Sequence, residues 1–124
     1  MIKLRFASAV IFAFELALVG CHSKRPPITY NSVVGMYVYN SNDPENRPTD
    51  HEWDRLTLSL DGKYDLVKGG PTKTKSDTTG RWYFRDGDPP EVDLDHAGFP
   101  VRVKRGEIRL LIDDDVGIWY VKSR

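Results

Sequence analysis

The only thiol in this chain of 124 residues belongs to Cys21. A deprotonated cysteine is a good nucleophile and can accept a covalent group. Cys21 follows directly on a largely apolar run from Phe6 to Val19, with Lys3 and Arg5 before it. This layout is typical of a secretory signal peptide, and the run is too short to span a membrane comfortably. Exported chains of this size often carry disulfides, but a single cysteine cannot form one internally.

Histidines and carboxylates are concentrated in the polar segments between apolar stretches. Such side chains bind a divalent metal where they converge, but no spacing here matches a known ligand motif. His51-Glu52 lacks the second histidine of a zinc-protease helix, and Asp113 to Gly117 does not fit a calcium loop. Because Asp also favours turns, we expect solvated turn residues and no metal or cofactor. The candidates are His51, Glu52, Asp95, His96, Asp113, Asp114 and Asp115.

Patterns typical of catalysis or of nucleic-acid binding are missing from the sequence. No serine lies in a Gly-x-Ser-x-Gly setting, and no glycine-rich phosphate loop precedes a helix. The 18 basic side chains are matched by 18 acidic ones, so the chain lacks the basic excess that nucleic-acid binding usually needs. We therefore expect neither an enzyme nor a nucleic-acid-binding protein.

The segment Leu18-Val19-Gly20-Cys21 resembles the bacterial lipobox, in which signal peptidase II cuts before a cysteine that carries diacylglycerol. The resemblance implies a helical signal peptide over 1–20 and a mature N-terminus at a lipidated Cys21, which two or more acyl chains would hold stably in a membrane. His22 in place of Asp implies export to the outer membrane, on its periplasmic face. Glu15 departs from the pattern, and the alternative is an uncleaved N-terminal helix with a buried thiol.

The mature chain is expected to form one antiparallel β domain over 33–124, after an extended tether over 21–32 that contains Pro26-Pro27. Apolar and polar residues alternate with a period of two, so that Leu56, Leu58 and Leu60 share one face. One apolar and one charged face indicate an antiparallel sheet with one wet side. The expected strands are 33–40, 53–60, 63–68, 80–85, 91–94, 100–104, 107–112 and 117–122.

Two turns and a recurring glycine–aromatic spacing indicate how these strands connect. Asp61-Gly62 is predicted to form a two-residue type I′ turn, and Arg105-Gly106 a second tight turn. A glycine also stands two residues before an aromatic residue at three expected strand starts, which favours a close backbone approach covered by a ring. These three segments are Gly35-Met36-Tyr37, Gly80-Arg81-Trp82 and Gly117-Ile118-Trp119.

Gly80-x-Trp82, together with the segment from Leu58 to Leu66, resembles small lipocalin-like barrels. The resemblance implies an all-β meander of about eight strands, closed or nearly closed into a barrel. Eight strands leave room for side chains or for one small molecule. Large rings are expected to fill that interior, and the alternative is a cavity for a small apolar ligand or lipid. The residues concerned are Tyr64, Trp82, Phe84 and Trp119.

If the strands run up and down in sequence order, the links 41–52, 69–79, 95–99 and 113–116 lie at one end, which we call the long-loop end. An even number of strands places both termini at the other end, so the long loops would point away from the membrane. Function tends to lie on long loops that a rigid scaffold holds. We therefore expect a lipid-anchored, non-catalytic binding module that docks a protein partner through the long-loop end. The alternative is a small apolar ligand or lipid inside the barrel.

Replacing Cys21 by serine tests the expected anchor. The variant Cys21→Ser should show no incorporation of labelled lipid, and the precursor should keep its leader, because a hydroxyl does not substitute for the thiol in this modification. Metabolic labelling with a fatty acid and the electrophoretic mobility of the full chain measure both effects. Lipid labelling and cleavage of Cys21→Ser at the wild-type level would contradict the lipobox interpretation.

Overall fold

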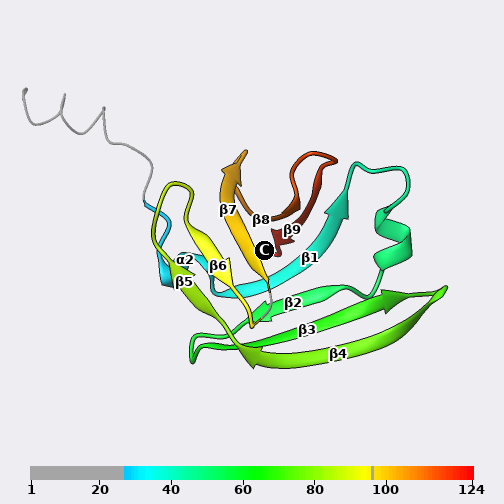
Figure 1. Cartoon of the computed structure of the whole chain (residues 1–124), viewed down its shortest axis with the longest axis horizontal. Coiled ribbons are helices and arrows are strands. Elements are labelled where there is room, and N and C mark those ends of the chain that lie inside the picture. The colour runs from blue at the N-terminus through cyan, green and yellow to red at the C-terminus, as the bar shows by residue number, and fades with distance from the viewer. Residues whose placement is uncertain (1–26, 96) are drawn as a thin grey trace, which may run out of the picture.

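The computed structural model describes residues 27–95 and 97–124 (Figure 1). The expected signal peptide, Cys21 and the first half of the tether, residues 21–26, lie outside the described residues, and so does His96. Within the described ranges, no helix is long and apolar enough to cross a membrane.

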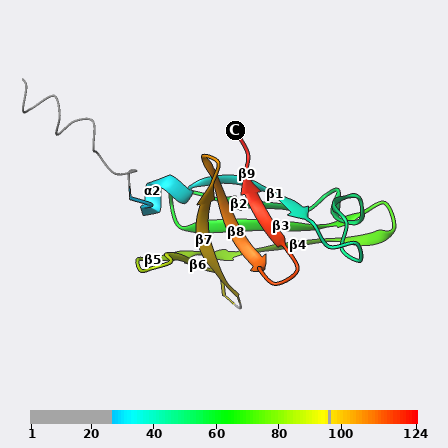
Figure 2. The same cartoon turned by 90° about the horizontal axis from the view of Figure 1, so that it is seen from above.

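The described residues form one sheet of nine strands with very little helix. Consecutive strands pair antiparallel, except that β4 and β5 do not pair with each other, and β1 also pairs with β9, so the meander curls into a nearly closed barrel (Figures 1 and 2). This confirms the predicted all-β, barrel-like fold. The elements are α2 (Tyr30–Val33), β1 (Gly35–Ser41), the 3-10 helix η2 (Pro48–His51), β2 (Arg55–Leu58), β3 (Lys63–Gly70), β4 (Lys73–Arg81), β5 (Tyr83–Arg85), β6 (Glu91–Asp93), β7 (Gly98–Lys104), β8 (Glu107–Asp113) and β9 (Ile118–Lys122).

The barrel closes through β4 and β5, which follow each other directly but stand at opposite ends of the sheet order. Only Trp82 separates them. β4 pairs with β3 on one side, and β5 pairs with β6 on the other. The two are therefore one long strand that changes partner at Trp82, and the expected strand 80–85 covers that point. Counted in this way, the meander has the eight strands that the sequence predicts.

The prediction of a long loop over 69–79 is wrong. β3 continues to Gly70, the turn needs only Pro71 and Thr72, and β4 begins at Lys73. Residues 73–79 are polar and exposed on both faces, because this end of the β3–β4 hairpin projects beyond the barrel wall (Figures 1 and 2). Such a strand has no apolar period, although its threonines favour extended structure.

The turn between β2 and β3 also differs from the prediction. β2 ends at Leu58, and the Gly62 N–H donates to the Ser59 carbonyl at 3.0 Å. Among residues 59–62 only Gly62 has a positive φ, of 85°. The connection is therefore a type I turn followed by a glycine bulge, which leaves Leu60 in the turn and 66% exposed. The Arg105-Gly106 turn, in contrast, is confirmed: both residues have positive φ, as a type I′ turn requires.

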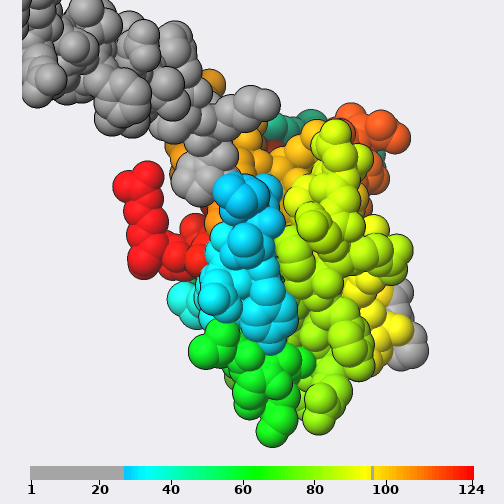
Figure 3. All heavy atoms as spheres, turned by 90° about the vertical axis from the view of Figure 1, so that its left-hand side faces the viewer, coloured from blue at the N-terminus to red at the C-terminus, as the bar shows by residue number. Residues whose placement is uncertain are grey.

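A short helix before β1, which the sequence analysis does not predict, caps the barrel at the end where the described chain begins. The Tyr30 ring stacks on Trp82 with centroids 4.4 Å apart, and its hydroxyl donates to the Leu60 carbonyl at 2.8 Å. Tyr37 donates to the Val33 carbonyl at 2.7 Å, and burial raises the pKa of that hydroxyl. Figure 3 shows residues 27–34 (blue to cyan) against β5 (yellow-green). These contacts close this end of the barrel, which also holds the C-terminus and is here called the entry end.

Gly80 confirms the expected close approach at the glycine–aromatic spacing. A Cβ placed there would lie 2.7 Å from the Tyr64 ring and would also overlap the Asp95 carboxylate. Tyr64 is directly opposite Gly80 in the β3–β4 ladder, on the inner face. The glycine therefore makes room for the ring, and the next inward side chain, Trp82, covers the gap.

Adding a methyl group at Gly80 should destabilise the barrel. We expect Gly80→Ala to lower the free energy of unfolding by about 1–3 kcal/mol through overpacking against Tyr64. Gly87→Ala is the matched control, because the nearest atom to its added Cβ is the Pro89 carbonyl oxygen at 3.4 Å, in an exposed turn. Urea unfolding of the full chain, followed by tryptophan fluorescence, measures both. Equal stabilities for the two variants would contradict the steric role of Gly80.

Candidate functional site

Three of the four rings expected at the interior lie on the inner face of the barrel. Trp82 is 2% exposed and donates from Nε1 to the Ser59 carbonyl at 2.9 Å. Tyr64 is buried in the same cluster, and Phe84 packs against it half-buried. Side chains fill the interior at this end, as the sequence analysis expects for Tyr64, Trp82 and Phe84. Together with the capping helix α2, these side chains close the barrel interior at the entry end.

Trp119 is buried but lies on the other side of the sheet. Its neighbour Tyr120 contacts Phe99 in the core, with ring centroids 6.0 Å apart in an edge-on arrangement. Successive side chains of a strand alternate between faces, so Trp119 faces outward, opposite Leu111 in the β8–β9 ladder. Trp119 therefore takes no part in the barrel interior.

A cavity of about 280 Å³ opens at the long-loop end. In the structure, the described residues of this end are 42–54, 71–72, 94–95, 97 and 114–117. The wall of the cavity is mostly aromatic and aliphatic, with a few polar groups from the 42–54 loop and β3. We call this cavity the mouth pocket. It is lined by Tyr39, Asn46, His51, Asp54, Leu66, Lys68, Leu94, Ala97, Phe99, Ile112, Ile118 and Tyr120.

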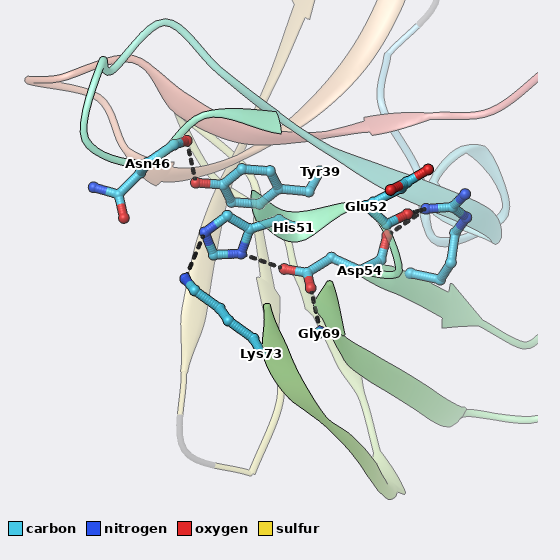
Figure 4. A network of polar contacts seen from close by, with 8 residues as sticks. Tyr39, Asn46, His51, Glu52, Asp54, Gly69 and Lys73 are labelled. Carbon is cyan, nitrogen blue, oxygen red and sulfur yellow. Dashed lines mark hydrogen bonds and ion pairs between the residues drawn. The ribbon is translucent and has the colours of Figure 1, made fainter. Parts of the chain in front are cut away.

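The polar side of the mouth pocket is built around Asp54, which is 2% exposed (Figure 4). One carboxylate oxygen accepts the Gly69 N–H at 2.8 Å, and the other lies 3.0 Å from Nδ1 of His51. The His51 ring stacks on Tyr39 at 4.1 Å between centroids, and Tyr39 donates from its hydroxyl to the Asn46 carbonyl at 3.1 Å. The network ties the 42–54 loop to β1 and β3.

The partners of His51 select its tautomer. A carboxylate only accepts hydrogen bonds and an ammonium only donates them, so Nδ1 carries the proton toward Asp54. Nε2 is then the acceptor for the Lys73 ammonium, 3.5 Å away. An aspartate that orients a histidine is common in catalytic and metal sites. Among the described residues, however, no hydrogen bond joins His51 to a serine or threonine hydroxyl. The arrangement shapes a pocket wall and can offer hydrogen bonds to a group inside it.

The other expected rim residues do not converge on His51. Glu52 is exposed, and Asp95 accepts the Tyr64 hydroxyl at 3.1 Å. Burial, and after it this contact with Asp95, raises the pKa of Tyr64. Asp113 accepts the Asp115 N–H at 3.1 Å within the β8–β9 turn, beside the exposed Asp114. Across residues 27–95 and 97–124, no group of three or more His, Asp and Glu side chains is placed to hold a metal ion.

The sequence pattern does not predict most of the residues that line the mouth pocket. Asp54 lies between Trp53 and Arg55 within an expected strand, where nothing in the pattern shows that a carboxylate will be buried. One available signal is the period-two pair Ile118 and Tyr120, which places inward side chains at the end of a strand. A second signal is Pro48 in Pro48-Thr49-Asp50-His51, since proline favours the first turn of a helix.

Removing the Asp54 carboxylate should loosen the 42–54 loop. We expect Asp54→Ala to lower the free energy of unfolding by about 1–3 kcal/mol, because it leaves the buried Gly69 N–H without an acceptor. Glu52→Ala removes an exposed carboxylate two residues away and should change little. Thermal unfolding of the full chain gives the stabilities, and amide exchange at Gly69 reports the local effect. Unchanged exchange at Gly69 in Asp54→Ala would contradict the role of Asp54.

Comparison with known proteins adds no functional information to this geometry. No protein-family model, no curated protein and no solved structure matches the chain.

Proposed function

We propose that this protein is a non-catalytic binding module of the bacterial cell envelope, anchored by a lipid on Cys21. In this proposal the mouth pocket receives an apolar side chain of a protein partner that docks on the long-loop end. The observation that carries the proposal is the pocket itself: a mostly apolar cavity that opens among the loops of one end. Apolar cavities with a few convergent polar groups are the usual form of a binding site.

The positions of the termini support a membrane anchor at the opposite end. Residues 27–34 and the C-terminal residues both lie at the entry end, where Lys122 donates to the Ser32 carbonyl at 2.8 Å (Figure 2). A lipidated Cys21 at the end of its tether would then present the long-loop end away from the membrane. With His22 after the cysteine, we propose the periplasmic face of the outer membrane as the location.

The size of the mouth pocket favours part of a partner over a whole lipid. Pockets for small molecules usually measure about 300–1,000 Å³, and this cavity, at about 280 Å³, lies at the small end of that range. Beyond it the interior is filled by core side chains, among them Leu56 and Leu110, which are fully buried. A single inserted side chain fits this space. The second candidate is a small apolar ligand, which the aromatic lining supports.

Site-specific photocrosslinking in cells tests the docking proposal. A photoreactive phenylalanine at Ile112, which lines the pocket and is half-exposed, should give one discrete crosslinked protein. The same probe at Tyr83, which is more exposed but lies on the outer face of β5, should not. Ala97→Trp, which fills the mouth, should abolish the Ile112 crosslink. Val116→Trp in the β8–β9 turn is the control for added bulk and should keep it.

The outcome separates the two candidates. Crosslinks of equal strength from Ile112 in the wild type and in Ala97→Trp would contradict docking through the pocket. A ligand in place of a partner would leave Ile112 without a protein crosslink and would appear as added mass in native mass spectrometry. That mass should be absent from Ala97→Trp and present in Val116→Trp.

A further inference from the structure

A second hollow, of about 390 Å³, lies on the outer face of β7, β8 and β9, separate from the mouth pocket. Its wall contains three basic side chains, from Arg102, Lys104 and Arg109, and one acidic side chain, from Asp114. The outward-facing Trp119 forms part of the same wall. The hollow therefore combines a positive charge excess with a buried indole. We call it the outer hollow.

The strand register places two of these positive charges side by side. Arg102 is directly opposite Arg109 in the β7–β8 ladder, and like charges at such positions repel each other. Arg109 is partly neutralised by Glu107 at 3.5 Å, and its guanidinium lies 4.5 Å from the centre of the Trp119 ring. In the part of the chain that the structure describes, neither Arg102 nor Lys104 forms an ion pair. A negative group in the outer hollow would offset this repulsion, which water otherwise screens at the exposed Arg102 and Lys104.

Two buried N–H groups at the same place also need an acceptor. The Trp119 side chain is 7% exposed, and Nε1 of Trp119 and Nε of Arg109 have no hydrogen-bond partner among the described residues. Buried polar groups are normally paired, so each exception calls for an explanation. Both groups can only donate. An anionic ligand with acceptor oxygens would pair both groups once the Arg109 side chain, which lies over the indole, shifts to admit it.

We propose that the outer hollow binds a phosphate group. A phosphate offers several acceptor oxygens and up to two negative charges, which matches three basic side chains and unpaired donors better than one carboxylate does. Arginine guanidinium groups bind phosphate through paired hydrogen bonds, and lysine binds it as a point charge. Arg102 and Arg109 would hold the oxygens from adjacent strands, and Lys104 would approach from the β7–β8 turn. The proposal is independent of the docking function assigned to the mouth pocket.

The phosphate has two possible sources, a lipid headgroup or a soluble phosphate. The Lys104 side of the outer hollow lies next to the β7–β8 turn, at the entry end together with residues 27–34 (Figure 2), whereas its other side is lined by Asn42, Asp114 and Gly117 at the long-loop end. A lipid headgroup would be within reach if the proposed anchor holds this end at a membrane, so that source rests on the proposed function. A soluble phosphate does not depend on the anchor.

Indole N–H resonances of the full chain in a nonionic detergent test the proposal. The protein has three tryptophans, and Trp119→Phe assigns the Trp119 signal. Inorganic phosphate, and separately a short-chain phosphatidylglycerol, should shift the Trp119 signal in a saturable way and leave those of Trp53 and Trp82 in place. Arg102→Gln should weaken binding about tenfold or more, as expected for the loss of a charged hydrogen-bonding partner. Arg81→Gln, on the exposed face of β4, should bind like the wild type.

The two titrations distinguish the sources while testing one site. A response to the phospholipid at much lower concentration than to phosphate assigns the site to a headgroup, and equal responses assign it to a soluble phosphate. An unchanged Trp119 signal in both titrations would overturn the proposal. So would a shift of equal size and midpoint in Arg102→Gln. The Trp82 signal, which reports the closed end of the barrel, checks that each variant is folded.

Discussion

The pairing of β1 with both β2 and β9 is the constraint on which the rest of the structure depends. It joins the first strand of the meander to the last, with Tyr39 opposite Tyr120. Closure fixes which side chains point inward, because side chains alternate along a strand except at the register shifts between Lys68 and Gly70 in β3 and between Leu111 and Asp113 in β8. The buried cluster then fills the entry end, where Trp82 and Tyr30 stack, and leaves the mouth pocket at the other. With one cysteine in the chain, no internal disulfide can help to hold this closure.

Because of the same alternation, the outer face of the barrel carries different side chains from the inner face. Trp119 is buried on that face under Arg109, next to an inward Tyr120 that belongs to the core. The barrel therefore presents two different surfaces. The long-loop end offers an apolar cavity with a buried carboxylate at its edge, and the outer hollow offers positive charge and unpaired donors. We propose different partners for the two surfaces because their chemistry differs.

The sequence predicts those parts of the fold that depend on apolar periodicity. The alternation of Leu56 and Leu58 identifies β2 and its buried face, and the antiparallel, sequence-ordered meander follows from such patterns. β4 is missed because residues 73–79 are polar on both faces of a projecting hairpin. Leu60 is misplaced because a glycine bulge, which needs only Gly62 at positive φ, ends the strand early.

The candidate sites depend on distances that the sequence does not encode. Aspartates are common in turns and exposed loops, and only the tertiary fold shows that Asp54 is buried beside Gly69 and His51. The inward or outward direction of Trp119 follows from the register of β8 and β9, which a one-residue shift would reverse. The lipobox resemblance of Leu18 to Cys21 concerns residues outside the described ranges and stays a prediction.

Xenon binding, followed through methyl resonances of the full chain, tests most directly whether the barrel is filled at one end and open at the other. Xenon enters dry apolar cavities. The account predicts shifts for the methyl groups of Ile112 and Ile118, which line the mouth pocket, and none for Val33 and Leu58 in the filled core. Shifts of equal size at Val33 and Leu58 would show an open interior and would contradict the account.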